Sequence, residues 1–198
     1  MSTSGALYDL MKLDDISKNI ISKMTKEEVY NESYKWACKH SETLKALIEK
    51  DIEYYKDILN IEREQEKPRK DIAKYSDIEN LIWYMYDDIF YNKEKEYEWK
   101  NITDKEEIKN ILEIYLNKYI SLDNKEIWFN NIKLMCDELG YASNMKEYKK
   151  NPELFKGNVA DVSTVLRVAL TSKSMTRDLF EIMSLMGIDR IKQRYLKI

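Results

Sequence analysis

Residues that interrupt regular backbone structure are scarce in this sequence. Its 198 residues include only four glycines and two prolines. Because these residues break helices and strands most strongly, their scarcity favours long elements with few tight turns. Hydrophobic residues make up 43% of the chain, which is enough to form a core. We therefore expect an all-α protein of one large domain or two small ones.

Signals for disulfides, secretion and membrane insertion are also lacking. Cys38 and Cys136 are far apart in the chain and do not have the spacing of a metal-binding or redox pair. No run of about 18 apolar residues occurs, and the N-terminus lacks the basic and apolar regions of a secretory signal. We therefore expect a cytoplasmic protein that does not bind membranes.

Catalytic patterns are equally scarce. His40 is the only histidine, which excludes metal sites built from several histidines. Neither GxGxxG nor GxxxxGK[ST] occurs, so no glycine-rich loop is expected to hold a phosphate. Adjacent carboxylates such as Asp87 and Asp88 lie in charged helical stretches that normally face solvent. We expect no catalytic residue, metal or cofactor in this chain.

Charge is distributed unevenly. The net charge of the chain is −3, which by itself does not favour nucleic-acid binding. Residues 145–198, however, carry eleven Lys and Arg against six Asp and Glu, a net charge of +5. This asymmetry suggests that the C-terminal part contacts a polyanion.

Local signals predict where several helices begin and end. Thr25 with Glu28, and Thr103 with Glu106, have the spacing of capping boxes that begin helices. Gly140 is expected to end a helix that begins at Asp123 or Asn124. The helical spacing of apolar residues over 41–59 predicts one long amphipathic helix.

The stretch LRVALTSKSMTRDLFEIM, residues 166–183, combines two apolar helical segments with a polar turn. Arg167 lies beside the apolar face of the first segment, where a planar guanidinium could stack on a base or bind a phosphate. We expect Thr176 to be the N-cap of the next helix. Its free N–H groups would then form a second site for an anion or a base edge.

This region resembles the C-terminal anticodon-binding region of bacterial glutamyl-tRNA synthetases. The family pattern begins with LR-hydrophobic-A-LTG, continues through a short turn to T/S-P-x-L-[FY]-E, and ends in a charged helix. The matching stretch of this chain is VADVSTVLRVALTSKSMTRDLFEIMSLMGIDRIKQRY. Three upstream stretches resemble the family in the same order: GALYDLMKLDDISKNII, IEREQEKPRKDIAKYSDI and WFNNIKLMCDELGYA. Together they cover most of the chain.

The resemblance implies a fragment of an enzyme that joins glutamate to its tRNA, without the nucleotide-binding catalytic domain. Residues 1–22 would be the remainder of a linker that contacts the tRNA stem. Residues 23–100 and 101–198 would be two consecutive helical-bundle anticodon-binding subdomains. The implied partner is tRNA(Glu), with tRNA(Gln) as a second candidate; DNA is not an expected partner, and a monomer is expected. ATP and Mg²⁺ would belong to the parent enzyme, a glutamate–tRNA ligase, and this fragment alone would not be an enzyme.

The resemblance also assigns site residues. Its motif places the anticodon contacts at Arg167, Thr164, Thr176, Arg177 and Leu179, to which we add Lys173 for its charge. Further contacts on the tRNA backbone or anticodon side are predicted at Arg63, Lys67, Arg69, Lys70, Lys192 and Arg194. Two positions depart from the family: Ser172 replaces a glycine that eases helix termination, and Arg177 replaces a proline.

A different class of function remains open on these observations. A helical protein-interaction module would bind a protein through an apolar groove, and the positive region would be incidental. Such a module would bind tRNA weakly and without regard to the anticodon.

Overall fold

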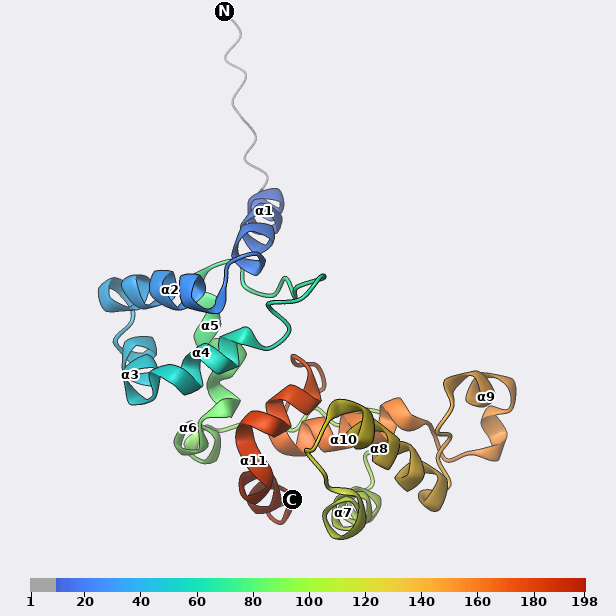
Figure 1. The fold of residues 1–198 in the computed structure, drawn as a ribbon. Helices are drawn as coiled ribbons and strands as arrows, with labels where there is room; N and C mark the ends of the chain where they lie inside the picture. Colours follow the sequence, from blue (N-terminus) through green and yellow to red (C-terminus); the bar gives the residue numbers. More distant parts are fainter. Residues whose placement is uncertain (1–9) are drawn as a thin grey trace, which may run out of the picture. The chain divides into compact units, whose positions relative to one another are not determined.

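The computed structural model describes residues 10–198, and the regular elements within this range are all helices (Figure 1). Apart from them, one isolated β-bridge joins Ala142 to Asn158. The prediction of an all-α protein is confirmed. Residues 1–9, which include part of the predicted linker, lie outside the described range.

The chain forms two compact units. Unit 1 ends at Trp83 and unit 2 begins at Tyr84, whereas the sequence predicts a division near residue 100. The difference arises because residues between 84 and 101 bond within unit 2. Asp87 pairs with Arg190 and Arg194, and Asn101 donates a hydrogen bond to Asp161 at 2.6 Å.

Unit 1 is built from short helices. In chain order they are α1 (Leu10–Ser22), α2 (Lys26–His40), α3 (Glu42–Lys50), α4 (Ile52–Asn60), the 3-10 turn η1 (Tyr75–Asp77) and α5 (Ile78–Ile82). The 3-10 turn η2 (Trp83–Met85) follows at the boundary. Helices α2, α3 and α4 pack against one another, and their buried side chains form the core of this unit (Figure 1).

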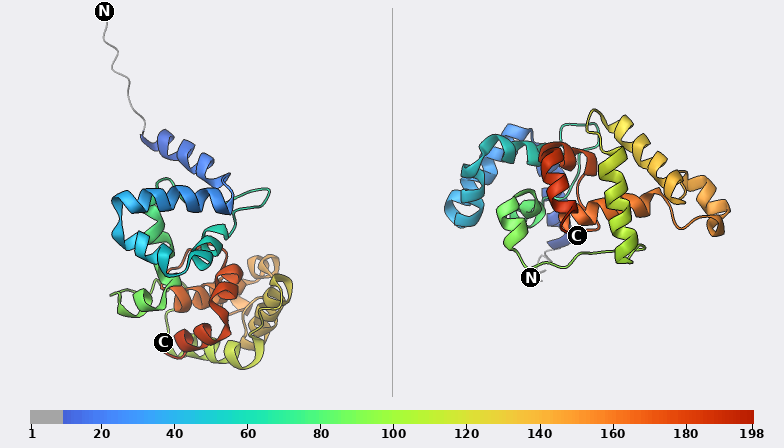
Figure 2. Two further views of the ribbon diagram at one scale, coloured as in Figure 1. Left: turned by 60° about the vertical axis from the view of Figure 1, so that its left-hand side comes forward. Right: turned by 90° about the horizontal axis from the view of Figure 1, so that it is seen from below.

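Unit 2 contains the remaining elements. They are α6 (Asp87–Asn92), α7 (Lys105–Ile114), the π-helix η3 (Tyr115–Tyr119), α8 (Lys125–Leu139), α9 (Met145–Lys150), the 3-10 turn η4 (Pro152–Leu154), α10 (Val159–Thr171) and α11 (Leu179–Tyr195). Helix α10 contacts α7, α8 and α11, which surround it (Figures 1 and 2). Eight of its thirteen residues are buried, as expected for a helix that is apolar on most sides.

Local capping signals predicted some helix ends and missed others. The Thr25–Glu28 capping box is present, and Gly140 ends α8 in the left-handed conformation at φ 82°. The predicted box at Thr103 is wrong, because the neighbouring Asp104 caps α7 by accepting a hydrogen bond from the Glu107 amide. The predicted single helix over residues 41–59 is also wrong. Asp51 interrupts it with extended backbone and caps α4 at the Tyr54 amide.

The last helix contains a break. Gly187 has φ 76° and ψ 161°, so α11 consists of two helical segments that meet at this residue. A residue with a side chain adopts such a conformation only with strain, and glycine therefore suits this position. The change of direction brings Arg190 and Arg194 towards Asp87.

Candidate functional site

A hollow of about 910 Å³ opens in unit 2 between α8, α10 and the α10–α11 loop, residues 172–178. Four of the six predicted anticodon-contact residues line it: Thr164, Arg167, Thr176 and Leu179. The sequence did not predict several other residues that line it: Lys125, Trp128 and Phe129 on α8, Met145 at the start of α9 and Met175 in the loop itself. The four motif residues come together because the loop and α11 fold back against α10, where Arg167 bonds to Thr176.

The backbone at Ser172 directs the chain into the α10–α11 loop. Ser172 adopts the left-handed conformation at φ 64°, and its N–H donates to the Val168 carbonyl at 2.7 Å. Helix α10 therefore ends where the family has a glycine, although a side chain is present. A non-glycine residue in this conformation costs about 1–2 kcal/mol. Contacts elsewhere in the unit must offset that cost.

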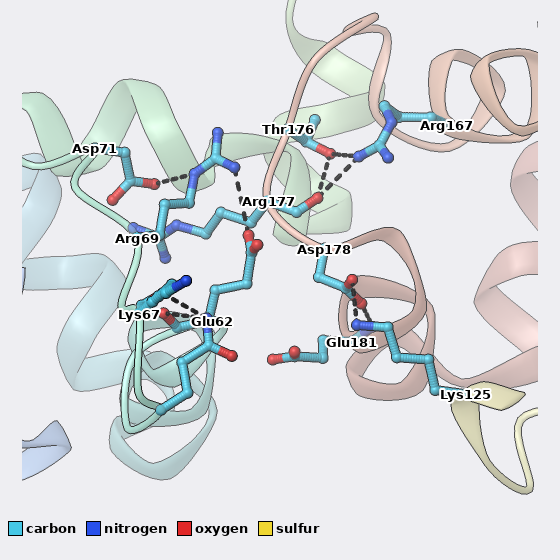
Figure 3. Close-up of polar contacts among 11 residues, drawn as sticks. Glu62, Lys67, Arg69, Asp71, Lys125, Arg167, Thr176, Arg177, Asp178 and Glu181 are labelled. Atoms are coloured by element: carbon cyan, nitrogen blue, oxygen red, sulfur yellow. Dashed lines mark hydrogen bonds and ion pairs between the residues drawn. The ribbon is translucent and has the colours of Figure 1, made fainter. Parts of the chain in front are cut away.

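Arg167 connects α10 to the loop. Its Nη1 donates hydrogen bonds to Thr176 Oγ1 at 2.5 Å and to the Arg177 carbonyl at 2.8 Å (Figure 3). The Thr176 hydroxyl in turn donates to the Arg177 carbonyl at 2.9 Å. A cation also suits this position because it lies in the last turns of α10, where the helix dipole is negative. The guanidinium is thus held at the hollow and also shapes the loop.

The predicted N-cap at Thr176 is wrong. Asp178 caps α11, because its carboxylate accepts a hydrogen bond from the Glu181 amide at 3.0 Å. The same carboxylate accepts a hydrogen bond from Lys125 Nζ at 2.6 Å (Figure 3). The first turn of α11 already has a carboxylate at its N–H groups, which removes the predicted anion site there.

Two predicted charges have other roles in the structure. Arg177 is 4% exposed in this structure, and its direct contact with a phosphate stays a prediction. Its contribution to the site is its carbonyl oxygen. Lys173 does not line the hollow, and its Nζ forms a 3.0 Å ion pair with Glu98.

Apolar surface is unusually exposed around the hollow. Phe129 and Met145 are each 38% exposed, and Met175 is 83% exposed. Aromatic and other apolar faces beside a guanidinium are suited to stacking against unpaired bases. Trp128 belongs to the buried stripe of α8, and Phe129, the next residue, lies off that stripe. That position was the sequence signal that the aromatic ring of Phe129 would be exposed.

In unit 1, Arg63 is a structural residue. Its side chain is buried, and it donates hydrogen bonds to the carbonyls of Leu59 at 2.9 Å and Ile21 at 2.6 Å. These carbonyls lie near the C-terminal ends of α4 and α1, where helical hydrogen-bond acceptors lack partners. The contact of Arg63 with tRNA stays a prediction, which its burial against these carbonyls does not favour.

The loop that follows α4 contains the other predicted contacts of unit 1. Arg69 donates to Asp71 at 3.2 Å and to Glu62 at 3.4 Å, which offsets its charge (Figure 3). Lys67 and Lys70 are exposed and line a hollow of about 880 Å³ with residues 22–25. Their contact with the tRNA backbone stays a prediction.

The two predicted contacts near the C-terminus differ. Lys192 is exposed on α11, as a phosphate contact requires. Arg194 is 1% exposed, donates to the Leu170 carbonyl and to Asp87 at 2.6 Å each, and stacks on Phe90 at 3.9 Å. Arg194 thus holds α6 and α11 together, and its contact with a phosphate stays a prediction that its burial does not favour. Burial lowers the pKa of Arg194, and the hydrogen bond to Asp87 opposes that shift.

Among residues 10–198, His, Cys, Asp and Glu side chains nowhere gather in threes that could hold a metal ion. Over the same residues, none of the helices combines the length and the apolar character needed to cross a membrane.

Comparison with known proteins shows the family to which the chain belongs. The sequence model of a family described as "Anticodon binding domain" matches residues 37–197, which is most of the chain and includes every residue lining the hollow. The chain belongs to the anticodon-binding domain family. It is an anticodon-binding domain homologous to part of glutamate–tRNA ligase, as its curated relatives show.

The similar curated proteins are bacterial glutamate–tRNA ligases. The chain is 40% identical over 198 residues to that of Acetivibrio thermocellus and 41% identical over 199 residues to that of Clostridium perfringens strain SM101. It is 35% identical over 199 residues to that of Clostridium beijerinckii. Each match covers 100% of this chain but only 36% of the relative, so the chain spans about a third of the length of these ligases.

Proposed function

We propose that this chain is the tRNA-binding part of a glutamate–tRNA ligase, and that the hollow in unit 2 receives unpaired anticodon bases of tRNA(Glu). The observation that supports this most directly is the convergence of Thr164, Arg167, Thr176 and Leu179 on one hollow with an exposed apolar rim. A single-stranded loop presents base faces for stacking and base edges for hydrogen bonds, and such a hollow offers partners for both.

In this proposal the residues have separate tasks. Arg167 contacts a base or a phosphate from a guanidinium already held by Thr176 and the Arg177 carbonyl. Phe129 and Met175 cover base faces, and Lys192 adds a phosphate contact that carries no sequence information. Lys67 and Lys70 of unit 1 are proposed as further phosphate contacts.

The wider activity follows from the relatives and is part of the same proposal. The ligase would attach glutamate to tRNA(Glu) during translation in the cytoplasm, and tRNA(Gln) is a second candidate substrate. ATP and Mg²⁺ would act in the catalytic part of the ligase, and the described residues would supply only tRNA binding. We propose that the chain is monomeric.

The test is a fluorescence anisotropy titration of the 198-residue chain with two RNA hairpins. One carries the anticodon stem and loop of tRNA(Glu), and the other has the same stem with a changed anticodon. The parent chain should prefer the first. Arg167→Ala should weaken binding to that hairpin by about 1–3 kcal/mol, the usual value of a specific base contact or stacking interaction.

Lys192→Ala is the matched control for the loss of a positive charge. Because a phosphate contact does not read sequence, this variant should weaken binding to both hairpins equally and reduce the salt dependence of binding. If the parent chain binds both hairpins equally, or Arg167→Ala binds like the parent, the proposed site is wrong. Weak binding that ignores the anticodon would favour the protein-interaction module instead.

A further inference from the structure

Glu98 makes an unusual set of contacts with the α10–α11 loop. It lies in the segment between α6 and α7, which has no regular secondary structure, and it is 76 residues from Ser174. Its backbone N–H donates to the Ser172 carbonyl at 3.0 Å. Its carboxylate accepts hydrogen bonds from the Ser174 amide at 2.9 Å, the Ser174 hydroxyl at 3.0 Å and Lys173 Nζ at 3.0 Å. Three consecutive loop residues are therefore bonded to this one residue.

These contacts hold the loop where it is conformationally costly. Ser172 is the residue with φ 64°, and the amide of Glu98 bonds to its carbonyl directly. Hydrogen bonds that involve a charged acceptor are roughly twice as strong as those between neutral groups. The Ser174 amide and Lys173 together hold the pKa of the Glu98 carboxyl at about 2, so it stays ionised at neutral pH.

The loop then runs directly into the hollow. Ser174, Met175 and Thr176 all line it, and Thr176 bonds to Arg167. Glu98 itself does not line the hollow. Its effect on a bound base would therefore pass through the loop.

We propose that Glu98 is a positioning residue for anticodon recognition, and that it holds the α10–α11 loop in the conformation that receives the bases. This inference rests on the proposed function. In this inference Glu98, a negatively charged residue, favours the binding of a polyanion, whereas electrostatics alone predicts that it opposes binding. Removing a carboxylate near a phosphate backbone should strengthen binding on charge alone, whereas releasing the loop should weaken it.

The test compares Glu98→Ala with Glu96→Ala, a control that removes the same charge from an exposed position two residues away. Hydrogen exchange of the loop amides is measured first, without RNA. Glu98→Ala should speed exchange at Ser174 about tenfold, because the amide loses a charge-assisted hydrogen bond, and Glu96→Ala should not. Unchanged exchange in Glu98→Ala would overturn the inference, whatever the RNA experiments show.

Binding to the two hairpins is measured next. We expect Glu98→Ala to bind the tRNA(Glu) hairpin about tenfold more weakly and to discriminate less between the anticodons. Glu96→Ala should bind as tightly as the parent or slightly more tightly. Glu98→Gln keeps an acceptor for Ser174 but loses the charge that pairs with Lys173, so its affinity should lie between those of the parent and Glu98→Ala.

The outcomes separate this inference from the proposed function. If the parent chain does not distinguish the hairpins, the proposed function fails at a step that does not involve Glu98. If the parent distinguishes them and Glu98→Ala does so equally well with unchanged or higher affinity, only the role of Glu98 is refuted. Circular dichroism of Glu98→Ala should show the helical content of the parent, and a loss of that content would overturn the local role assigned to this residue.

Discussion

Replacing Ser172 with glycine should stabilise the protein, although it removes atoms from a buried site. Ser172 is 1% exposed and has φ 64°, a conformation that costs a residue with a Cβ atom about 1–2 kcal/mol. Glycine adopts it without that cost. Both hydrogen bonds of Ser172 described above, from its N–H to Val168 and from Glu98 to its carbonyl, involve the backbone and are kept in the variant.

The expected increase in the free energy of unfolding is smaller than the conformational cost at Ser172. Glycine raises the conformational entropy of the unfolded chain, which lowers the free energy of unfolding by about 0.4–1 kcal/mol. The remaining gain for Ser172→Gly is therefore about 0.5–1 kcal/mol. For a chain of this size that corresponds to a rise in melting temperature of about 1–4 °C, which differential scanning calorimetry can resolve.

Ser184→Gly is the matched control. Ser184 is exposed within α11, where its backbone is helical and glycine is unfavourable by about 0.5 kcal/mol relative to serine. The same chemical change should thus raise stability at one position and lower it at the other. If both variants lose stability, the strain assigned to Ser172 does not exist.

Two further predictions concern charged residues with structural roles. Arg63→Ala should lower the free energy of unfolding, measured by urea denaturation, by about 2–4 kcal/mol, because the carbonyls of Leu59 and Ile21 lose a charged donor. The control Lys70→Ala, at an exposed position, should change the free energy of unfolding by less than about 0.5 kcal/mol. An equally small effect of Arg63→Ala would contradict the structural role assigned to Arg63. Burial opposes the ionisation of Asp87, but hydrogen bonds from Arg194 and Arg190 outweigh it and lower its pKa. A carboxylate with a lowered pKa contributes stability that is present above its unfolded-state pKa of about 4 and is lost as the pH falls through the folded value. Asp87→Asn should therefore be less stable than the parent at pH 7 and should lose less stability than the parent between pH 4 and pH 2; identical pH profiles would refute this assignment.

The sequence by itself determined features that depend on neighbours in the chain. The Thr25–Glu28 capping box and the left-handed turn at Gly140 form from residues within one or two helical turns. Short-range signals were ambiguous where two capping residues are adjacent, as at Thr103 and Asp104. The motif resemblance also found four residues of the hollow, because Thr164, Arg167, Thr176 and Leu179 lie on α10, the loop that follows it and the first turn of α11.

Which charged side chains are exposed depends on packing between segments that are distant in the sequence. Arg63, Arg194 and Lys192 are all cations in charged stretches, but the first two are buried against carbonyls and the third is exposed. The carbonyl of Ile21 is 42 residues from Arg63, and Glu98 is 76 residues from Ser174. A guanidinium or a carboxylate is placed by whichever unpaired donors and acceptors the packing brings within about 3 Å of it, and no local pattern encodes those distant partners.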